Sequence, residues 1–170
     1  MTLRELELNE LNHFVAMEYH MLILNRTYLI LLTSDSLIGI KVNGIVSIES
    51  GGDRITRKIT NSLSIQGDLS DPHSYIKAKF IQQIIDTNLT DGSIIKANKS
   101  NFIIKKESII KVYHDEKSKR GMGYYPHDGK VYITTKEGKK REFIILGNQS
   151  GKKIVQLIRK VLDLKQMAEL

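Results

Sequence analysis

The sequence predicts an α+β domain in which an antiparallel β split barrel, or strongly bent sheet, is capped by a C-terminal amphipathic helix. Two observations lead to this prediction. Runs rich in β-branched and aromatic residues recur between turn signals, as in residues 28–42. The last segment has the three-to-four-residue apolar period of a helix with one buried face, in Ile154, Val155, Leu157, Ile158, Val161, Leu162 and Leu164.

Composition indicates one globular domain over residues 1–170, and the expected order of strands and helices places its barrel core at about 27–168. Apolar residues make up 41% of the 170 residues, enough for one well-formed core. The absence of Cys excludes disulfides, thiol catalysis and Cys-ligated metal. The first ten residues are acidic and do not resemble a secretory signal, and the apolar run 21–32 is too short to span a bilayer. We therefore expect a cytoplasmic protein, or one that is peripheral at a membrane.

Two additional helices are expected, one as an N-terminal extension and one inserted between strands. Residues 3–24 space apolar side chains such as Leu3, Leu6 and Leu11 at helical intervals. Asp71 and Pro72 are typical of a helix start and favour a helix over 72–89, which Asp91 and Gly92 would end. The apolar stripes of both helices either support self-association or are buried in the protein's own core.

Strands are expected on both sides of the inserted helix. Residues 34–36 join strands at 26–33 and 37–42, and an Asn-Gly pair at 43–44 leads into a short strand at 45–49. Residues 54–65 are expected to be an exposed strand or an ordered loop. Later strands are expected at 94–95, 101–106, 108–114, 130–135 and 141–146, with a polar loop at 116–128 and the last helix over 151–168.

Two segments resemble bacterial pleckstrin-homology-like proteins. Residues 28–42, YLILLTSDSLIGIKV, resemble their early strand–turn–strand motif, in which a Leu-Thr pair precedes a polar turn. Residues 101–160 resemble their closing strands and helix, and the two segments cover about half the chain. The resemblance implies a split barrel capped by a helix, and a binding module rather than an enzyme.

Positive charge is concentrated near the C-terminus. Residues 101–170 contain 16 of the 26 Lys and Arg but only 8 of the 19 Asp and Glu. AT-rich codon use would also enrich Lys, together with Ile and Asn, so composition alone is a second explanation. The candidate ligand-binding residues lie in two basic loops: Lys117, Lys119, Arg120, Tyr124 and Tyr125 in the first, and Lys136, Lys139, Lys140 and Arg141 in the second. Consecutive connections of a meander lie at opposite ends, so a shared site is not implied.

Residues 147–153, GNQSGKK, are similar to a phosphate-binding loop but lack its defining spacing. The loop is one residue short of GxxxxGK[ST], and Lys153 occupies the position of the metal-binding hydroxyl. We interpret it as a strand-to-helix turn with Ser150 as the N-cap. The five histidines do not cluster in sequence. His114 and His127, with their neighbouring carboxylates, flank one loop and are interpreted as loop residues rather than metal ligands.

The sequence therefore predicts a non-catalytic binding or scaffolding module with no cofactor, no metal site and no catalytic residues. Its expected partner is acidic: a protein segment or an anionic membrane surface, contacted through the basic loops. Nucleic-acid binding through the same charges is the alternative. Homo-oligomerisation would use the apolar stripes.

Overall fold

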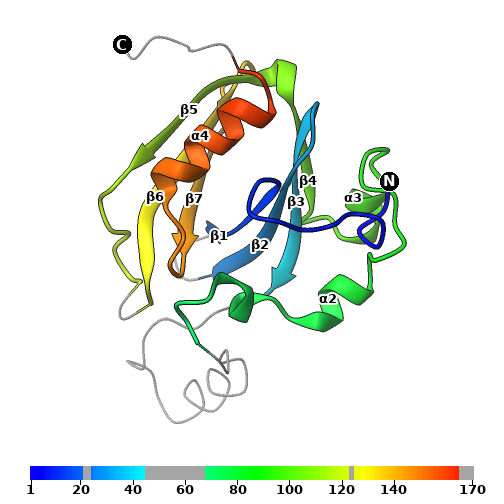
Figure 1. Cartoon of the computed structure of the whole chain (residues 1–170), viewed down its shortest axis with the longest axis horizontal. Coiled ribbons are helices and arrows are strands. Elements are labelled where there is room, and N and C mark those ends of the chain that lie inside the picture. The colour runs from blue at the N-terminus through cyan, green and yellow to red at the C-terminus, as the bar shows by residue number, and fades with distance from the viewer. Residues whose placement is uncertain (21–23, 45–67, 123–124, 165–170) are drawn as a thin grey trace.

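The computed structural model describes residues 1–20, 24–44, 68–122 and 125–164. Within them, seven antiparallel strands form one curled sheet in the order β4-β3-β2-β1-β7-β6-β5, with helix α4 packed on one face (Figure 1). The predicted fold class is confirmed. The elements are β1 His13–His20, β2 Leu24–Leu32, β3 Ser36–Asn43, β4 Phe102–Lys105, β5 Ile109–Asp115, β6 His127–Thr135, β7 Lys140–Leu146 and α4 Gly151–Val161.

Strand β1 joins the two parts of the sheet. It pairs with β2 along its whole length, from His13 opposite Leu31 to His20 opposite Leu24. It pairs with β7 at only two positions, where Ala16 lies opposite Ile145 and Met17 lies opposite Ile144. Because the second contact is short, the sheet can curl there, with β4 to β1 on one side and β7 to β5 on the other (Figure 1).

The inner face of the sheet packs against α4. Phe14, Phe143 and Ile133 from the strands and Ile158 from the helix are almost fully buried in this inner cluster. The helix begins as predicted, because the Ser150 side chain accepts a hydrogen bond from the Lys153 backbone N–H. It ends at Val161, seven residues earlier than the predicted 168, although residues 165–170 lie outside the described residues.

The described residues cover the outer face over only part of the sheet. Its buried cluster joins strand residues such as Val15, Met17 and Ile38 to Ile84 and Leu89. Together with Leu3, these covering residues lie in the segments at 1–8 and 69–94, and the cluster contains no residue of β5 or β6. The stripes considered for self-association therefore contribute side chains to the protein's own core.

The predicted helix at 3–24 is wrong. Residues 13–20 form β1, and its alternate side chains enter different clusters: Phe14 and Ala16 the inner one, Val15 and Met17 the outer one. A strand buried on both faces has no apolar–polar alternation. Its run of apolar residues therefore also matched helical spacing.

The predicted helix at 72–89 is broken into short pieces. The pieces are η1 Pro72–Tyr75 and α2 Ala78–Gln82, and Asp71 caps the first as predicted. Ile76 and Lys77 have extended backbone conformations, which interrupt the helix. The Lys77 N–H donates to the Val42 carbonyl at 3.0 Å, so this part of the chain is hydrogen-bonded to the end of β3. The expected strand at 94–95 is also wrong, because these residues lie in α3 Ser93–Ala97.

The remaining strands lie close to their predicted positions, at 26–33, 37–42, 101–106, 108–114, 130–135 and 141–146. The predicted strand at 45–49 and the segment 54–65 lie outside the described residues. Figure 1 shows α4 along β5, β6 and β7, with α2 and α3 on the far side of β3. Arg159 of α4 donates to the Val112 carbonyl at 2.8 Å, which satisfies a backbone group on the edge strand β5.

Candidate functional site

The two predicted basic loops lie at opposite ends of β6. Residues 116–126 connect β5 to β6, and residues 136–139 connect β6 to β7. The structure therefore does not bring the loops together as one site. Tyr124 lies outside the described residues.

Several of the predicted site residues have structural contacts. Arg141 lies over the Phe102 ring, 3.5 Å from its centre, and donates to Glu18 Oε2 at 2.8 Å. Tyr125 packs against the outer cluster, with its ring 6.4 Å from that of Tyr75. Lys139 pairs with Glu137 at 3.2 Å. Four of the predicted cations, Lys117, Arg120, Lys136 and Lys140, have no ion pair among the described residues.

The outer surface of β5, β6 and β7, where no described element packs over it, forms a more compact site, which we call the Lys–Tyr face: Lys111, Tyr113, Tyr132 and Lys140. Tyr113 and Tyr132 are opposite each other on β5 and β6, and their rings stack at 4.9 Å with an angle of 23°. Lys140 Nζ lies 4.0 Å from the centre of the Tyr132 ring, and Lys111 Nζ lies 5.3 Å from that of Tyr113. Each ammonium is thus held by an aromatic face.

Both carboxylates beside this face are already paired. Glu142 accepts hydrogen bonds from Lys119 and, at 2.7 Å, from the Tyr132 hydroxyl. Burial opposes ionisation of Glu142, but these two donors hold its pKa below the ordinary value. Lys130 pairs with Asp115 at 2.9 Å. Of the four lysines Lys111, Lys119, Lys130 and Lys140, the second and third are therefore neutralised by these carboxylates. Lys111 and Lys140 lack a carboxylate partner in the described part of the chain, so the four lysines and two carboxylates have a net charge of +2.

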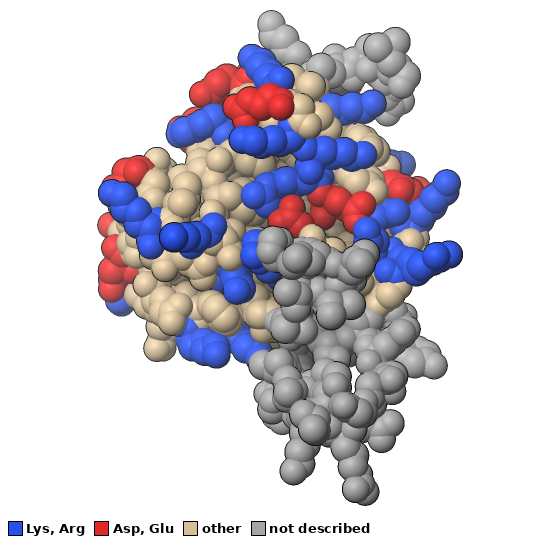
Figure 2. Space-filling model, turned by 180° about the vertical axis from the view of Figure 1, so that it is seen from behind, with Lys and Arg blue, Asp and Glu red and all other residues tan. Residues whose placement is uncertain are grey.

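Seen from behind, the molecule carries Lys and Arg over much of its surface, with Asp and Glu in a few smaller groups among them (Figure 2). Burial, followed by the hydrogen bond to Glu142, raises the pKa of Tyr132 well above its ordinary value, so this hydroxyl remains a donor.

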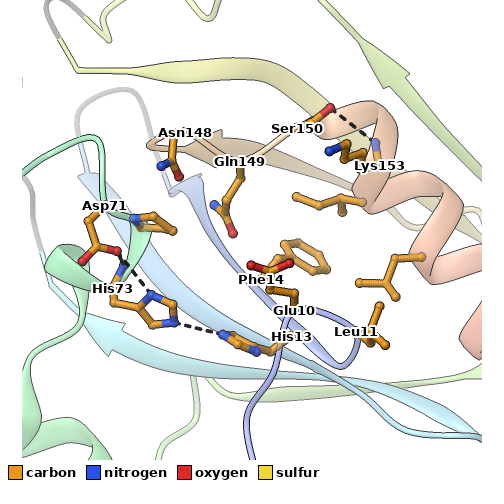
Figure 3. Close-up of a pocket in the computed structure, with 13 residues that line it drawn as sticks. Glu10, Leu11, His13, Phe14, Asp71, His73, Asn148, Gln149, Ser150 and Lys153 are labelled. Atoms are coloured by element: carbon orange, nitrogen blue, oxygen red, sulfur yellow. Dashed lines mark hydrogen bonds and ion pairs between the residues drawn. The ribbon is translucent and has the colours of Figure 1, made fainter.

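A second candidate site is a pocket of about 570 Å³ between the start of β1, η1 and the start of α4, which we call the histidine pocket. His13 and His73 lie at one side of it and Lys153 lies across it (Figure 3). The two imidazole Nε2 atoms are 3.0 Å apart. Burial, opposed by a hydrogen bond to the Asn9 carbonyl, lowers the pKa of His13. The structure thus brings together two histidines that are 60 residues apart in the sequence.

The loop at 147–153 is a helix start, as predicted. Its backbone donors have protein partners: the Asn148 N–H donates to the Ser70 carbonyl at 2.7 Å, and the Gly151 N–H donates to Asp128 Oδ2 at 2.7 Å. Gln149 bonds the backbone of β1, with Val15 as both donor and acceptor. These N–H groups are therefore not arranged to hold a phosphate.

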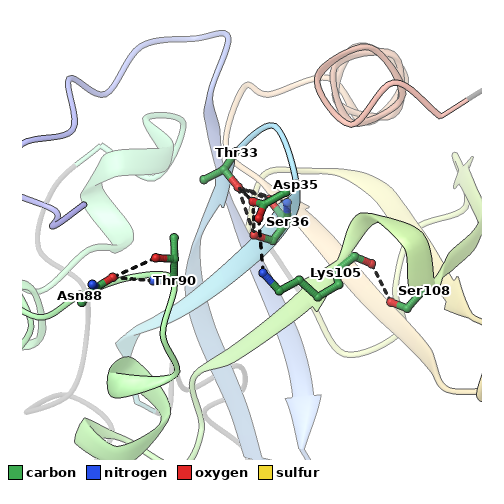
Figure 4. Close-up of polar contacts among 7 residues, drawn as sticks. All are labelled: Thr33, Asp35, Ser36, Asn88, Thr90, Lys105 and Ser108. Atoms are coloured by element: carbon green, nitrogen blue, oxygen red, sulfur yellow. Dashed lines mark hydrogen bonds and ion pairs between the residues drawn. The ribbon is translucent and has the colours of Figure 1, made fainter.

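A third polar cluster, at the β2–β3 turn, has a structural role. The Thr33 and Ser36 hydroxyls donate to Asp35 Oδ1 at 2.8 Å, and Lys105 donates to Asp35 Oδ2 at 3.4 Å (Figure 4). The Lys106 N–H donates to the Asp35 carbonyl. These bonds attach the hairpin turn to the end of β4.

Sequence reasoning found part of the Lys–Tyr face and none of the histidine pocket. Lys140 was among the candidate residues, and Lys111 and Tyr113 lie two apart in the predicted strand at 108–114 and so on one side of it, but nothing in the spacing indicated Tyr132 as their neighbour. Among the described residues, no group of three or more His, Cys, Asp and Glu is arranged to hold a metal, and no helix is long and apolar enough to cross a membrane.

Comparison with known proteins gives no assignment. No protein-family model, no curated protein and no solved structure matches the chain. Any function assigned to the candidate sites therefore has to be inferred from their geometry and charge.

Proposed function

We propose that this chain is a non-catalytic binding module whose Lys–Tyr face binds an acidic segment of another protein. The observation that carries the proposal is the position of Lys111 and Lys140, two ammonium groups held over stacked tyrosines without a carboxylate partner in the described structure. An incoming Asp or Glu would pair with them, and the tyrosine rings would contact its apolar neighbours. A pair of exposed charges contributes about 0.2–1 kcal/mol, so affinity would come from several contacts and fall with salt.

The arrangement favours a protein segment over a membrane surface. The cations lie along a sheet face, and the two basic loops are at opposite ends of β6 rather than together at one end. An extended acidic chain can follow such a face, whereas a flat anionic surface is contacted best by loops that project together. The curled sheet with its C-terminal helix also supports a pleckstrin-homology-like fold, a class composed mostly of binding modules.

Single-stranded nucleic acid is a second candidate, favoured by the Tyr113–Tyr132 pair between lysines. Both candidates use the same face, so a single binding experiment compares them.

The test is fluorescence anisotropy with a labelled glutamate-rich peptide, alongside mixed-sequence single-stranded DNA and flotation with phosphatidylserine-containing vesicles. We expect salt-sensitive binding of the peptide and weaker binding of DNA and vesicles. Lys111→Glu/Lys140→Glu should weaken peptide binding about tenfold or more, because each reversal replaces attraction with repulsion.

The matched control is Lys152→Glu/Lys160→Glu, which makes the same charge change at exposed positions on α4. This variant should bind the peptide about as well as the parent. Equal losses in the two variants would reduce the effect to net charge and overturn the proposal. Tighter binding of DNA or vesicles than of peptide would also overturn it.

A further inference from the structure

We propose that His13 and His73 form a binding site for a divalent transition-metal ion of the zinc class. The site does not depend on the Lys–Tyr face. It lies at the opening of the histidine pocket, where His13 begins β1 and His73 belongs to η1 (Figure 3).

Hydrogen bonds leave both Nε2 atoms available as ligands. His13 Nδ1 is 2.7 Å from the Asn9 carbonyl, which can only accept, so this nitrogen carries the proton. His73 Nδ1 is 3.3 Å from Asp71 Oδ1 and donates to that carboxylate. In the neutral rings, the two Nε2 lone pairs therefore face each other, an arrangement that a cation between them, either a proton or a metal ion, would stabilise.

The separation of these atoms matches a shared ion. With Zn–N bonds of about 2.0–2.1 Å, two nitrogen ligands lie about 3.3–3.4 Å apart at the tetrahedral angle and about 2.8–3.0 Å apart at an angle of 90°. The observed Nε2–Nε2 distance is 3.0 Å, and the rings are tilted by 56° rather than stacked. Converging ring edges are what a common ligand requires.

The partners of the other ring nitrogens also fit. Metal-binding histidines usually donate their second N–H to a carboxylate or a backbone carbonyl, which orients the ring. Asp71 is such a partner for His73, and the Asn9 carbonyl is such a partner for His13.

Charge and access complete the site. Glu10 lines the same pocket and supplies a negative charge, which favours a cation. Lys153 supplies a positive charge, but it lies across the pocket from the two histidines (Figure 3). The His73 side chain is 55% exposed, so an ion can enter, and water would complete the coordination. Imidazole nitrogen suits Zn²⁺, Ni²⁺ and Cu²⁺ better than Mg²⁺ or Ca²⁺.

The test is calorimetric titration of the EDTA-treated, dialysed protein with Zn²⁺, with Mg²⁺ as the contrasting ion. We expect one saturable Zn²⁺ site and no Mg²⁺ binding there. His73→Gln should remove the site, Asp71→Asn should weaken it by about tenfold to a hundredfold, and the control His127→Gln should retain it. His73 is exposed, so its variant can be checked for native circular dichroism before titration.

Nitrogen NMR of the unaltered protein gives a second measurement that needs no variant. Zn²⁺ should shift the Nε2 resonances of His13 and His73 together, while their Nδ1 atoms stay protonated. Absence of Zn²⁺ binding, unchanged affinity in His73→Gln, or shifts at other histidines only would overturn the proposal.

Discussion

Gly39 is the position where one added methyl group would most directly test the packing of the inner face. It lies on β3 between Ile30 of β2 and Phe102 of β4. The Phe102 ring crosses the space where a side chain would be. A Cβ at residue 39 would lie 2.8 Å from Phe102 Cδ1 and closer still to Cε1 and Cζ. Gly39→Ala therefore forces the ring to move.

The expected cost follows from the contacts of that ring. Phe102 stacks on Phe143 at 6.0 Å, meets the edge of Tyr28 at 5.3 Å and supports the Arg141 guanidinium. Overpacking costs about 1–3 kcal/mol, and a disturbed aromatic pair adds about 0.5–1.5 kcal/mol. We expect the free energy of unfolding to fall by about 2–4 kcal/mol in urea titrations, with an unchanged slope.

Two comparisons show whether the ring is the cause. Gly44→Ala should be nearly neutral, because no atom of the described residues lies within 4 Å of the added Cβ and the backbone conformation there does not require glycine. In a Phe102→Leu background, Gly39→Ala should cost clearly less than it does alone, giving a coupling energy between the two sites. Additive effects of the two substitutions would refute the packing argument.

Three further predictions use the same urea titration. Tyr75→Phe should raise the free energy of unfolding by about 1 kcal/mol, because this buried hydroxyl has no hydrogen-bond partner among the described residues. Burial also raises the pKa of Tyr75 to about 12. As the contrasting variant, Tyr28→Phe should lower the free energy of unfolding by about 1 kcal/mol, because it removes a donor to a backbone carbonyl at 3.1 Å. Ser150→Ala should lower it by about 0.5–1 kcal/mol through loss of the α4 cap, and no change would contradict that role. Hydrogen bonds, first from Ser36, lower the pKa of Asp35 to about 2. The ionised Asp35 therefore stabilises the fold above about pH 4, and this contribution is lost as the pH falls toward 2. The difference in free energy of unfolding between Asp35→Asn and the parent should narrow over that pH range.

The sequence was sufficient for the hairpins and the last helix because their signals are local. The polar turn at Asp35 and the cap at Ser150 each act within a few residues, and both have the predicted role. The β1 strand was missed because its environment is not local. Phe14 and Val15 are both buried, on opposite faces, and only the completed fold supplies the second layer.

The candidate sites likewise combine features that are local in the sequence with contacts between distant residues. A loop rich in Lys is visible in a sequence, but whether each cation is paired depends on distant residues: Lys119 has Glu142 and Arg141 has Glu18. Lys140 was recognised, whereas its position over Tyr132 depends on the register between β6 and β7. The His13–His73 contact depends on how η1 returns to β1, for which the sequence has no periodic signal.

The most direct test of the proposed function is an NMR titration of the ¹⁵N-labelled protein with the glutamate-rich peptide. The proposal predicts that the largest amide shift changes occur at Lys111, Tyr113, Tyr132 and Lys140, saturate with peptide and diminish with added salt. Changes confined to the loops at 117–120 and 136–139, or to α4, would contradict it.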